Sequence, residues 1–365
     1  MDRMEAIKWV LTVCGALRLS QAKTLAELVV ATCRVDRVNL PSIAQRLDGA
    51  STLKQAIKRV WRFTANRRVE IGTAMEGVVR QLVARRKEAL VVALDWVEVR
   101  TFHTLSAVAV LPGRGVPLLW ASYPEWQLHK SQNSLEEGLL RLLRTMLPAS
   151  LPVILVADRG FGRTELARVC QELGFHYVVR ITPDVYVRSA RFSGKLLDYP
   201  VKRGLRRLLK NVEYRRHHPV TQHVAVLWKR KLPKRRDEPW FLMTDLEWPA
   251  TRLSELYGRR MTIEETFRDH KSRRNGYALR NTRIQHVDHF DRLLLILALA
   301  YLLVVGLGLH ARRLYCPANW CSNTRRSECS AFTIGRRMLD RLQVPIPQLL
   351  QELRRASKIP QANWG

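Results

Sequence analysis

The sequence predicts an α/β protein in which a mixed sheet with helices on its faces follows an N-terminal helical region. Residues 1 to about 86 contain helical patterns and hardly any strand signal, whereas residues 88–182 alternate short apolar runs with amphipathic segments. The 365-residue chain is 47% apolar. A chain of this length and composition can form more than one domain and bury a substantial core.

The N-terminal region contains a pair of segments typical of a helix-turn-helix, at residues 40–69. Pro41 and Ser42 open the first helix, and a break follows at Asp48. We expect the second helix to contact DNA through four exposed cations, namely Lys54, Lys58, Arg59 and Arg62. Short helical pairs are also common in ordinary bundles, so the motif alone does not establish this role.

Residues 88–182 have the pattern of a mixed sheet. Strand-like runs occur at ALVVALDWVEV, TLSAVAVL and LLWASYP, and the amphipathic segment SLEEGLLRLLRTML follows them. Next come the strand VILVAD, the helix RTELARVCQEL and the strand HYVVRIT. The order β-β-β-α-β-α-β predicts a mixed sheet with helices on its faces. Residues 183–240 are strand-like, basic and punctuated by proline, which predicts a β-rich insertion, and helices return at 251–275 and 286–312.

These patterns predict three regions. The first is a helical DNA-binding domain over residues 1–86. The second is a catalytic domain over residues 87–312, interrupted by the insertion at 183–240. Residues 313–365 form a C-terminal region whose candidate role is dimerisation.

The charge balance predicts a polyanionic partner. Lys and Arg number 62 against 32 Asp and Glu, for a formal net charge of +30 spread along the whole chain. The six cysteines form no C-x2-C pair, and the N-terminus does not resemble a signal peptide, so we expect reduced thiols in the cytoplasm. Residues 293–309 are uncharged, at the lower length limit for spanning a bilayer. Their charged flank and the lack of a second such segment favour a buried core helix and no membrane association.

Two aspartates stand where ligand-binding groups commonly lie in α/β sheets. Asp95 and Asp158 close apolar strand-like runs, and strand ends line the crevice in which open α/β sheets bind ligands. Each aspartate alone is more often a turn or cap residue. Gly160 and Gly162, which follow Asp158, leave room for backbone or substrate to come close.

A third candidate acid lies in the predicted helix over 251–275. Tyr257, Arg260, Glu264 and Lys271 stand at offsets of 3, 7 and 14 residues, which puts them within roughly 60° of one helical face. Glu265 points about 100° away, so Glu264 is the expected partner of the two aspartates. The alternative is a solvated stripe of i, i+4 ion pairs, and spacing alone does not exclude it.

The segment YGRRMTIEETFRDHK resembles the Y-x2-R-x3-E-x6-K signature of bacterial insertion-sequence transposases of the insertion-sequence-four family, which cut and paste DNA through a DDE triad. The resemblance covers roughly residues 88–312 and includes LDWVEV, VADRGFGR and the β-rich insertion. It implies a ribonuclease-H-like fold and two Mg2+ or Mn2+ ions held by Asp95, Asp158 and Glu264. It also implies that Tyr257, Arg260 and Lys271 hold phosphates of the transposon end.

Relatives with this signature commonly cut flanking DNA through a hairpin, with an aromatic residue stacked on a flipped base. Trp240, in EPWFLMTDL, resembles that residue. The alternative is a tryptophan buried in a strand.

The resemblance therefore implies a transposase that excises an insertion sequence and inserts it by metal-dependent hydrolysis and strand transfer. Its partners would be double-stranded DNA with terminal inverted repeats, target DNA, and a second copy of the chain in a synaptic homodimer, and it would act in the cytoplasm at the nucleoid. Two alternatives remain open. One is a ribonuclease-H-like nuclease or resolvase without strand transfer, and the other is a catalytically silent DNA-binding repressor.

Overall fold

A computed structural model describes residues 2–49, 52–228, 238–322 and 329–358. The chain forms two compact units. Unit 1 comprises Met1–Arg86, Trp96–Ala149 and Thr262–Gly365, and unit 2 comprises Lys87–Asp95 and Ser150–Met261.

The N-terminal part of unit 1 is helical, as predicted. Its helices are α1 (Arg3–Val13), α2 (Leu19–Cys33), α3 (Leu40–Ala44), α4 (Leu53–Ala65) and α5 (Ile71–Val83). Side-chain caps begin the helices of the predicted helix-turn-helix. Asn39 accepts a hydrogen bond from the Ser42 amide at 2.9 Å, and Thr52 accepts one from the Gln55 amide at 3.3 Å, so each helix has one of its first N–H groups satisfied.

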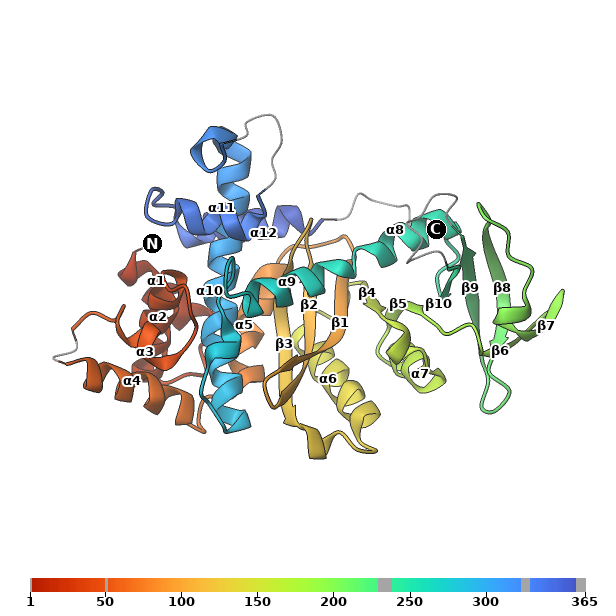
Figure 1. Cartoon of the computed structure of the whole chain (residues 1–365), viewed down its shortest axis with the longest axis horizontal. Helices are drawn as coiled ribbons and strands as arrows, with labels where there is room; N and C mark the ends of the chain where they lie inside the picture. The colour runs from red at the N-terminus through yellow and green to blue at the C-terminus, as the bar shows by residue number, and fades with distance from the viewer. Residues whose placement is uncertain (1, 50–51, 229–237, 323–328, 359–365) are drawn as a thin grey trace. The chain divides into compact units, whose positions relative to one another are not determined.

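Helix α10 (Val287–Leu314) is the core helix of unit 1 (Figure 1). It packs against α2, α4, α11 (Ala331–Met338) and α12 (Ile346–Ala356). Its most apolar stretch is 94% buried. The length and hydropathy of α10 are sufficient to cross a membrane, but the neighbouring helices supply its apolar surroundings, which confirms the predicted core helix.

Helices α10 and α11 approach each other closely through glycine. A Cβ added to Gly308 would lie 1.7 Å from the carbonyl oxygen of Ala331, and one added to Gly335 would lie 1.8 Å from that of Val304. No larger residue fits at these positions without moving backbone, because the neighbouring atoms belong to the main chain.

Unit 1 also contains an antiparallel hairpin of β2 (Phe102–Val110) and β3 (Gly115–Pro124). The hairpin register runs from Phe102 opposite Pro124 to Val110 opposite Gly115. Helix α6 (Gln132–Met146) also belongs to unit 1, as does helix α9 (Met261–Lys271) from Thr262 onward. The 3-10 turns assigned to unit 1 are η1 (Glu125–Gln127), η5 (Leu279–Asn281) and η6 (Pro317–Asn319).

Unit 2 is built on parallel strands extended by antiparallel ones. The first residues of β1 (Leu90–Val99) pair in parallel with β4 (Val153–Ala157), which pairs in parallel with β5 (Phe175–Arg180). Strand β10 (Trp240–Thr244) then runs antiparallel between β5 and β9 (Val220–Leu227). The remaining elements of unit 2 are η2 (Arg159–Phe161), α7 (Thr164–Glu172), β6 (Tyr186–Ser189), β7 (Phe192–Lys195), η3 (Leu196–Asp198), β8 (Arg206–Tyr214) and α8 (Ala250–Gly258).

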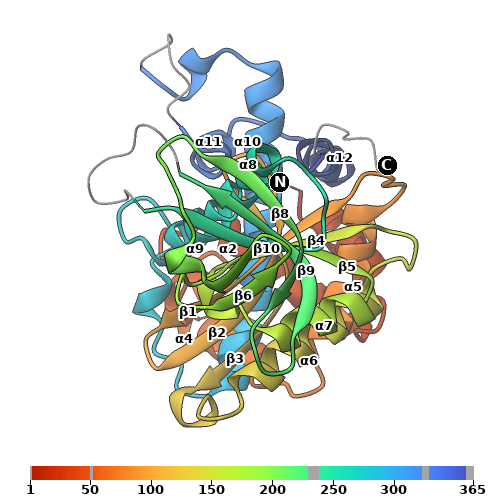
Figure 2. The ribbon, with the colours of Figure 1, turned by 90° about the vertical axis from the view of Figure 1, so that its right-hand side faces the viewer.

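The hydrogen-bonded strand order is β3-β2-β1-β4-β5-β10-β9-β8-β6-β7, and β1 has residues in both units. Figure 2 shows β6, β8 and β9, which belong to the predicted insertion, together with β10, which begins at its end. The mixed α/β class and the order β-β-β-α-β-α-β are confirmed. Residues 229–237 of the insertion lie outside the described residues. The predicted domain boundaries stay predictions.

Candidate active site

Asp95 and Asp158 lie at the carboxyl ends of the paired segments of β1 and β4. Leu94 and Ala157 are opposite each other in the parallel pairing of β1 and β4, and each aspartate directly follows one of them. Neighbouring strands are about 4.8 Å apart. Two residues distant in the sequence therefore emerge side by side from the parallel strands.

One expectation about Asp95 is wrong, because it does not end its strand. Strand β1 continues to Val99, with Val97 and Val99 buried and Glu98 between them exposed. This alternation is that of a half-buried strand. The shorter β4 ends at Ala157, so Asp95 lies on β1 where its parallel neighbour has stopped.

Asp158 caps the 3-10 turn that follows β4. Its Oδ1 accepts a hydrogen bond from the Gly160 amide at 2.9 Å. A Cβ at Gly160 would lie 3.2 Å from the same oxygen, and one at Gly162 would lie 3.1 Å from the Arg180 carbonyl oxygen. The two glycines therefore let the chain fold tightly around the Asp158 carboxylate.

Arg260 forms an ion pair with Asp95. Arg260 Nη1 lies 3.1 Å from Asp95 Oδ2, and the two side chains are 12% and 17% exposed. At this burial the attraction between the charges is less screened than at the surface. The guanidinium therefore orients the Asp95 carboxylate.

Tyr257 and Trp240 form an aromatic pair in unit 2. Tyr257 is buried, and its ring meets that of Trp240 edge to face, with centroids 5.4 Å apart and an interplanar angle of 79°. Burial raises the pKa of Tyr257, and the charge of Asp158 adds to that rise. The phenol therefore remains protonated at neutral pH and able to donate a hydrogen bond.

Trp240 is half-buried and opens β10, so it is neither a fully buried strand residue nor a fully exposed one. The Arg180 guanidinium lies 5.6 Å from the centre of its indole ring, within cation–π range, and also pairs with Glu238. Arg180 was not selected from the sequence. Only the antiparallel pairing of β5 with β10, in which Arg180 is opposite Leu242, brings it to Trp240.

The segment 251–275 forms two helices and not the one that the sequence predicted. The prediction that Tyr257, Arg260, Glu264 and Lys271 share one helical face is therefore wrong. Helix α8 ends at Gly258 and α9 begins at Met261. The Arg259 and Arg260 amides bond to carbonyls three residues back, those of Leu256 and Tyr257, at 3.1 and 2.9 Å. This tighter 3-10 bonding follows Gly258, the weakest helix former of the segment, and separates Tyr257 from Glu264 and Lys271 by a turn.

Helix α9 carries two adjacent acids with different surroundings. Glu265 pairs with Arg268 at 2.9 Å and with Arg114 at 3.6 Å. Glu264 lies in the first turn of α9, one position earlier and about 100° around the helix. Glu265 is therefore engaged as a structural ion-pair partner, whereas Glu264 points in another direction.

Arg114 also anchors α9 through Asp269. Arg114 Nη2 donates to Asp269 Oδ1 at 3.2 Å, its Nε donates to Oδ2, and the Tyr301 hydroxyl donates to Oδ2 at 2.9 Å. One residue further along the hairpin, the Gly115 amide donates to Thr266 Oγ1 at 2.8 Å. These contacts fix α9 to the turn of the β2–β3 hairpin within unit 1.

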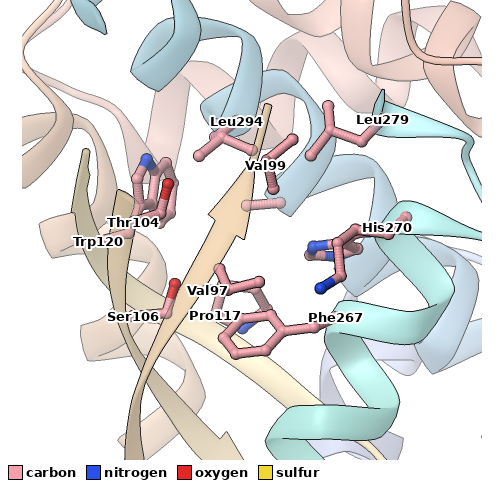
Figure 3. Close-up of a pocket in the computed structure, with 12 residues that line it drawn as sticks. Val97, Val99, Thr104, Ser106, Pro117, Trp120, Phe267, His270, Leu279 and Leu294 are labelled. Carbon is pink, nitrogen blue, oxygen red and sulfur yellow. The ribbon is translucent and has the colours of Figure 1, made fainter. Parts of the chain in front are cut away.

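Lys271 lines a small apolar pocket of unit 1 with Phe267, His270 and Trp120 (Figure 3). The pocket holds about 30 Å³, space for about one water molecule. Burial lowers the pKa of His270 to about 3, and its Nε2 has no hydrogen-bond partner among the described residues. A neutral histidine in so small a space is part of the core and not a phosphate site. The predicted phosphate contact of Lys271 stays a prediction.

The candidate residues are divided between the units. Asp95, Asp158, Trp240, Tyr257 and Arg260 belong to unit 2, and Glu264 and Lys271 belong to unit 1. Within the described part of the chain, no three Asp, Glu, His or Cys side chains gather as a metal site.

The predicted DNA-contacting cations of α4 also differ among themselves. Lys54, Lys58 and Arg62 are exposed. Arg59 is only 37% exposed and pairs with Glu27, which also binds Arg3. The expectation that Arg59 is exposed like the others is therefore wrong, because α2 supplies a carboxylate beside it.

Comparison with known proteins gives one family. A family model described as a transposase DDE domain matches residues 86–303, which is more than half of the chain. The match contains Asp95, Asp158 and Glu264 and extends through the strands of the β-rich insertion. No curated protein matches the sequence.

Proposed function

The chain belongs to the transposase DDE domain family, whose members cleave and transfer DNA strands with the help of divalent metals, and on that premise we propose that it excises an insertion sequence and joins it to target DNA. Its mixed α/β fold is consistent with the ribonuclease-H-like fold of this family. The Y-x2-R-x3-E-x6-K spacing over residues 257–271 supports membership of the insertion-sequence-four group.

The observation that carries the proposal is the pair of carboxylates at the ends of the paired segments of β1 and β4. Asp95 and Asp158 come from separate parts of the sequence and follow directly opposed residues. We propose Glu264 as the third acid. It follows Arg260, the ion-pair partner of Asp95, by four residues, and four residues span at most about 14 Å of extended chain. Chain connectivity therefore limits the distance between Glu264 and Arg260.

The donor set fits Mg2+ or Mn2+, since carboxylate oxygens are the ligands that hard divalent ions prefer. Asp95, Asp158 and Glu264 would hold two such ions, which when bound activate the attacking oxygen and stabilise the leaving one. Arg260 pairs with Asp95 and orients its carboxylate. Tyr257 stays protonated and can donate a hydrogen bond to a phosphate oxygen. Arg260 and Lys271 are the proposed cationic contacts to the transposon end.

We also propose that Trp240 stacks on a base flipped from a hairpin on the transposon end. Its half-buried ring lies beside the Arg180 guanidinium, so that a base on the indole would have a cation close to its phosphate. Trp240→Ala is expected to reduce hairpin formation more than the first nick on a labelled DNA end. Equal loss at both steps would leave Trp240 a structural role only.

The central experiment compares adjacent acids of α9. Purified protein is incubated with Mg2+, a target plasmid and labelled DNA from the borders of its gene. Asp158→Asn and Glu264→Gln are expected to lose cleavage and joining, whereas Glu265→Gln is the matched control and retains them. Cleavage that survives Glu264→Gln but not Glu265→Gln would reject the assignment. EDTA is expected to abolish the reaction of the intact protein.

The same assay separates the alternatives. Free ends without joined products would indicate a nuclease or resolvase, and binding without cleavage would indicate a repressor. We propose terminal inverted repeats and target DNA as partners and a homodimer in the synaptic complex, acting at the nucleoid. Light scattering would test the homodimer by measuring the mass of the complex between the protein and DNA from the transposon end. We expect a mass that corresponds to two chains and two DNA ends.

A further inference from the structure

A groove in unit 1 contains none of the candidate catalytic residues. It holds about 950 Å³ and is lined by α3, α4, the segment 281–289 and the turn between β1 and β2. The described residues that line it include no carboxylate, but they include these basic residues: Arg37, Arg100, Arg283, His286 and His289. The groove is therefore suited to an anionic ligand.

Two of the arginines are available to such a ligand. Arg37 and Arg283 are exposed, and among the described residues neither side chain has a hydrogen bond or an ion pair. Arg100 has a different role, because its Nη1 donates to the carbonyl oxygen of Thr282 and so fixes the segment 281–289 to the β1–β2 turn. The groove thus has one side fixed by the Arg100–Thr282 hydrogen bond. It also has two guanidinium groups, those of Arg37 and Arg283, without an ion-pair partner among the described residues.

An exposed aromatic ring stands in the same groove. Trp61 of α4 is 52% exposed although it is one of the largest apolar side chains of the region. Its ring meets His289 edge to face at 6.1 Å and 82°, and His289 lies 5.0 Å from His286. These contacts hold the indole in place while half of the side chain faces solvent. An orientated, exposed tryptophan is a platform on which a flat ring can stack.

We propose that this groove binds a short stretch of single-stranded DNA, with phosphates on Arg37 and Arg283 and a base stacked on Trp61. Cations beside an exposed aromatic ring are the composition of single-strand sites. In a duplex both faces of each base are covered by its neighbours, so only an unpaired base can use the indole. The proposed function would supply such a strand when it separates ends from flanking DNA, but binding in the groove requires no cleavage.

The test measures fluorescence anisotropy of a labelled oligothymidylate of about twelve nucleotides with the full-length protein and EDTA. Trp61→Ala is expected to weaken binding by about 5- to 150-fold, the range for loss of one stacked base, and Trp61→Phe to retain most of it. Trp126→Ala is the control, since Trp126 is 75% exposed and lies outside the groove.

The cationic part of the groove is tested by salt dependence. Arg283→Ala is expected to reduce the slope of log affinity against log salt by about 0.7, the value for one phosphate of a single strand. Lys23→Ala removes the same charge from an exposed position outside the groove and should leave the slope unchanged. A slope equally reduced in both variants would mean that net charge alone attracts the oligonucleotide.

Three further outcomes would overturn the proposal. The first is unchanged affinity for oligothymidylate in both Trp61→Ala and Arg283→Ala. In the other two, these variants lose affinity as expected, but the intact protein binds a blunt duplex or oligouridylate more tightly than oligothymidylate. The first would leave the groove without a nucleic-acid role, and the others would assign it to duplex DNA or to RNA. Asp158→Asn should bind oligothymidylate as the intact protein does. Intact single-strand binding in a protein that never cleaves would therefore reject the proposed function alone.

Discussion

Arg114 compensates the buried carboxylate of Asp269, and its removal is expected to destabilise the protein. The two side chains are 13% and 8% exposed, and their contact uses both carboxylate oxygens. Removing one partner of a buried ion pair costs about 3–5 kcal/mol, because the other charge is left uncompensated. We expect Arg114→Met, which keeps much of the side-chain volume, to lower the free energy of unfolding by about that amount in urea at pH 7.

The penalty should depend on pH in a defined direction. Burial raises the pKa of Asp269 above its ordinary value, and Arg114 opposes that rise. Without Arg114 the folded-state pKa rises further, so the folded protein binds more protons than the unfolded chain once the pH exceeds the unfolded value near 4. Stability of Arg114→Met should therefore fall more steeply than wild type as pH rises. Its penalty should be smaller at pH 5 than at pH 7.

A double variant isolates the uncompensated charge. Asp269→Asn removes the charge but keeps the shape of the side chain, so Arg114→Met with Asp269→Asn should be more stable at pH 7 than Arg114→Met alone. A double variant that loses the sum of both single penalties, or a penalty equal at pH 5 and pH 7, would refute the reasoning. Either result would mean that the pair acts through packing and not through charge.

Two further changes test the packing and charge of unit 1. Gly308→Ala should lower the free energy of unfolding by about 1–3 kcal/mol, since its Cβ would overlap the Ala331 carbonyl. Gly138→Ala, with nothing within 4 Å of the added Cβ, should raise it by about 0.5–1 kcal/mol. Urea unfolding compares the two variants, and equal effects would contradict the close contact between α10 and α11. Burial raises the pKa of Asp291 to about 7, so the free energy of unfolding of the wild type should fall as pH rises from about 4 to about 7. Asp291→Asn should flatten that pH dependence. The same pH dependence in the variant and the wild type would show that Asp291 does not cause it.

Much of the sheet was predictable because its signals are local. Apolar runs of strand length and amphipathic segments between them determine the alternation along residues 88–182, and β1 to β5 follow it. The burial of α10 was predictable for a similar reason, since a helix that is apolar on all sides requires partners on all sides.

The features that the sequence did not reveal depend on contacts between distant residues or on small changes in bonding. The break between α8 and α9 arises from carbonyl partners three residues back instead of four, a difference that residue spacing does not show. The ion pair of Arg59 with Glu27 was not predicted, because Glu27 lies on another helix. For the candidate site, spacing suggested the acids, but only the opposition of Leu94 and Ala157 brings two of them to one sheet edge.

The position of α10 within unit 1 has a consequence for biosynthesis. Arg292 of α10 donates to the carbonyl oxygens of Val69 and Thr64, residues made 223 and 228 positions earlier. At about 5–20 residues per second, a ribosome needs about 10 to 45 seconds to cover that interval. During this time the apolar faces of the N-terminal helices have no α10 to cover them, so the nascent chain should depend on chaperones and should be most prone to aggregation before Arg292 leaves the exit tunnel.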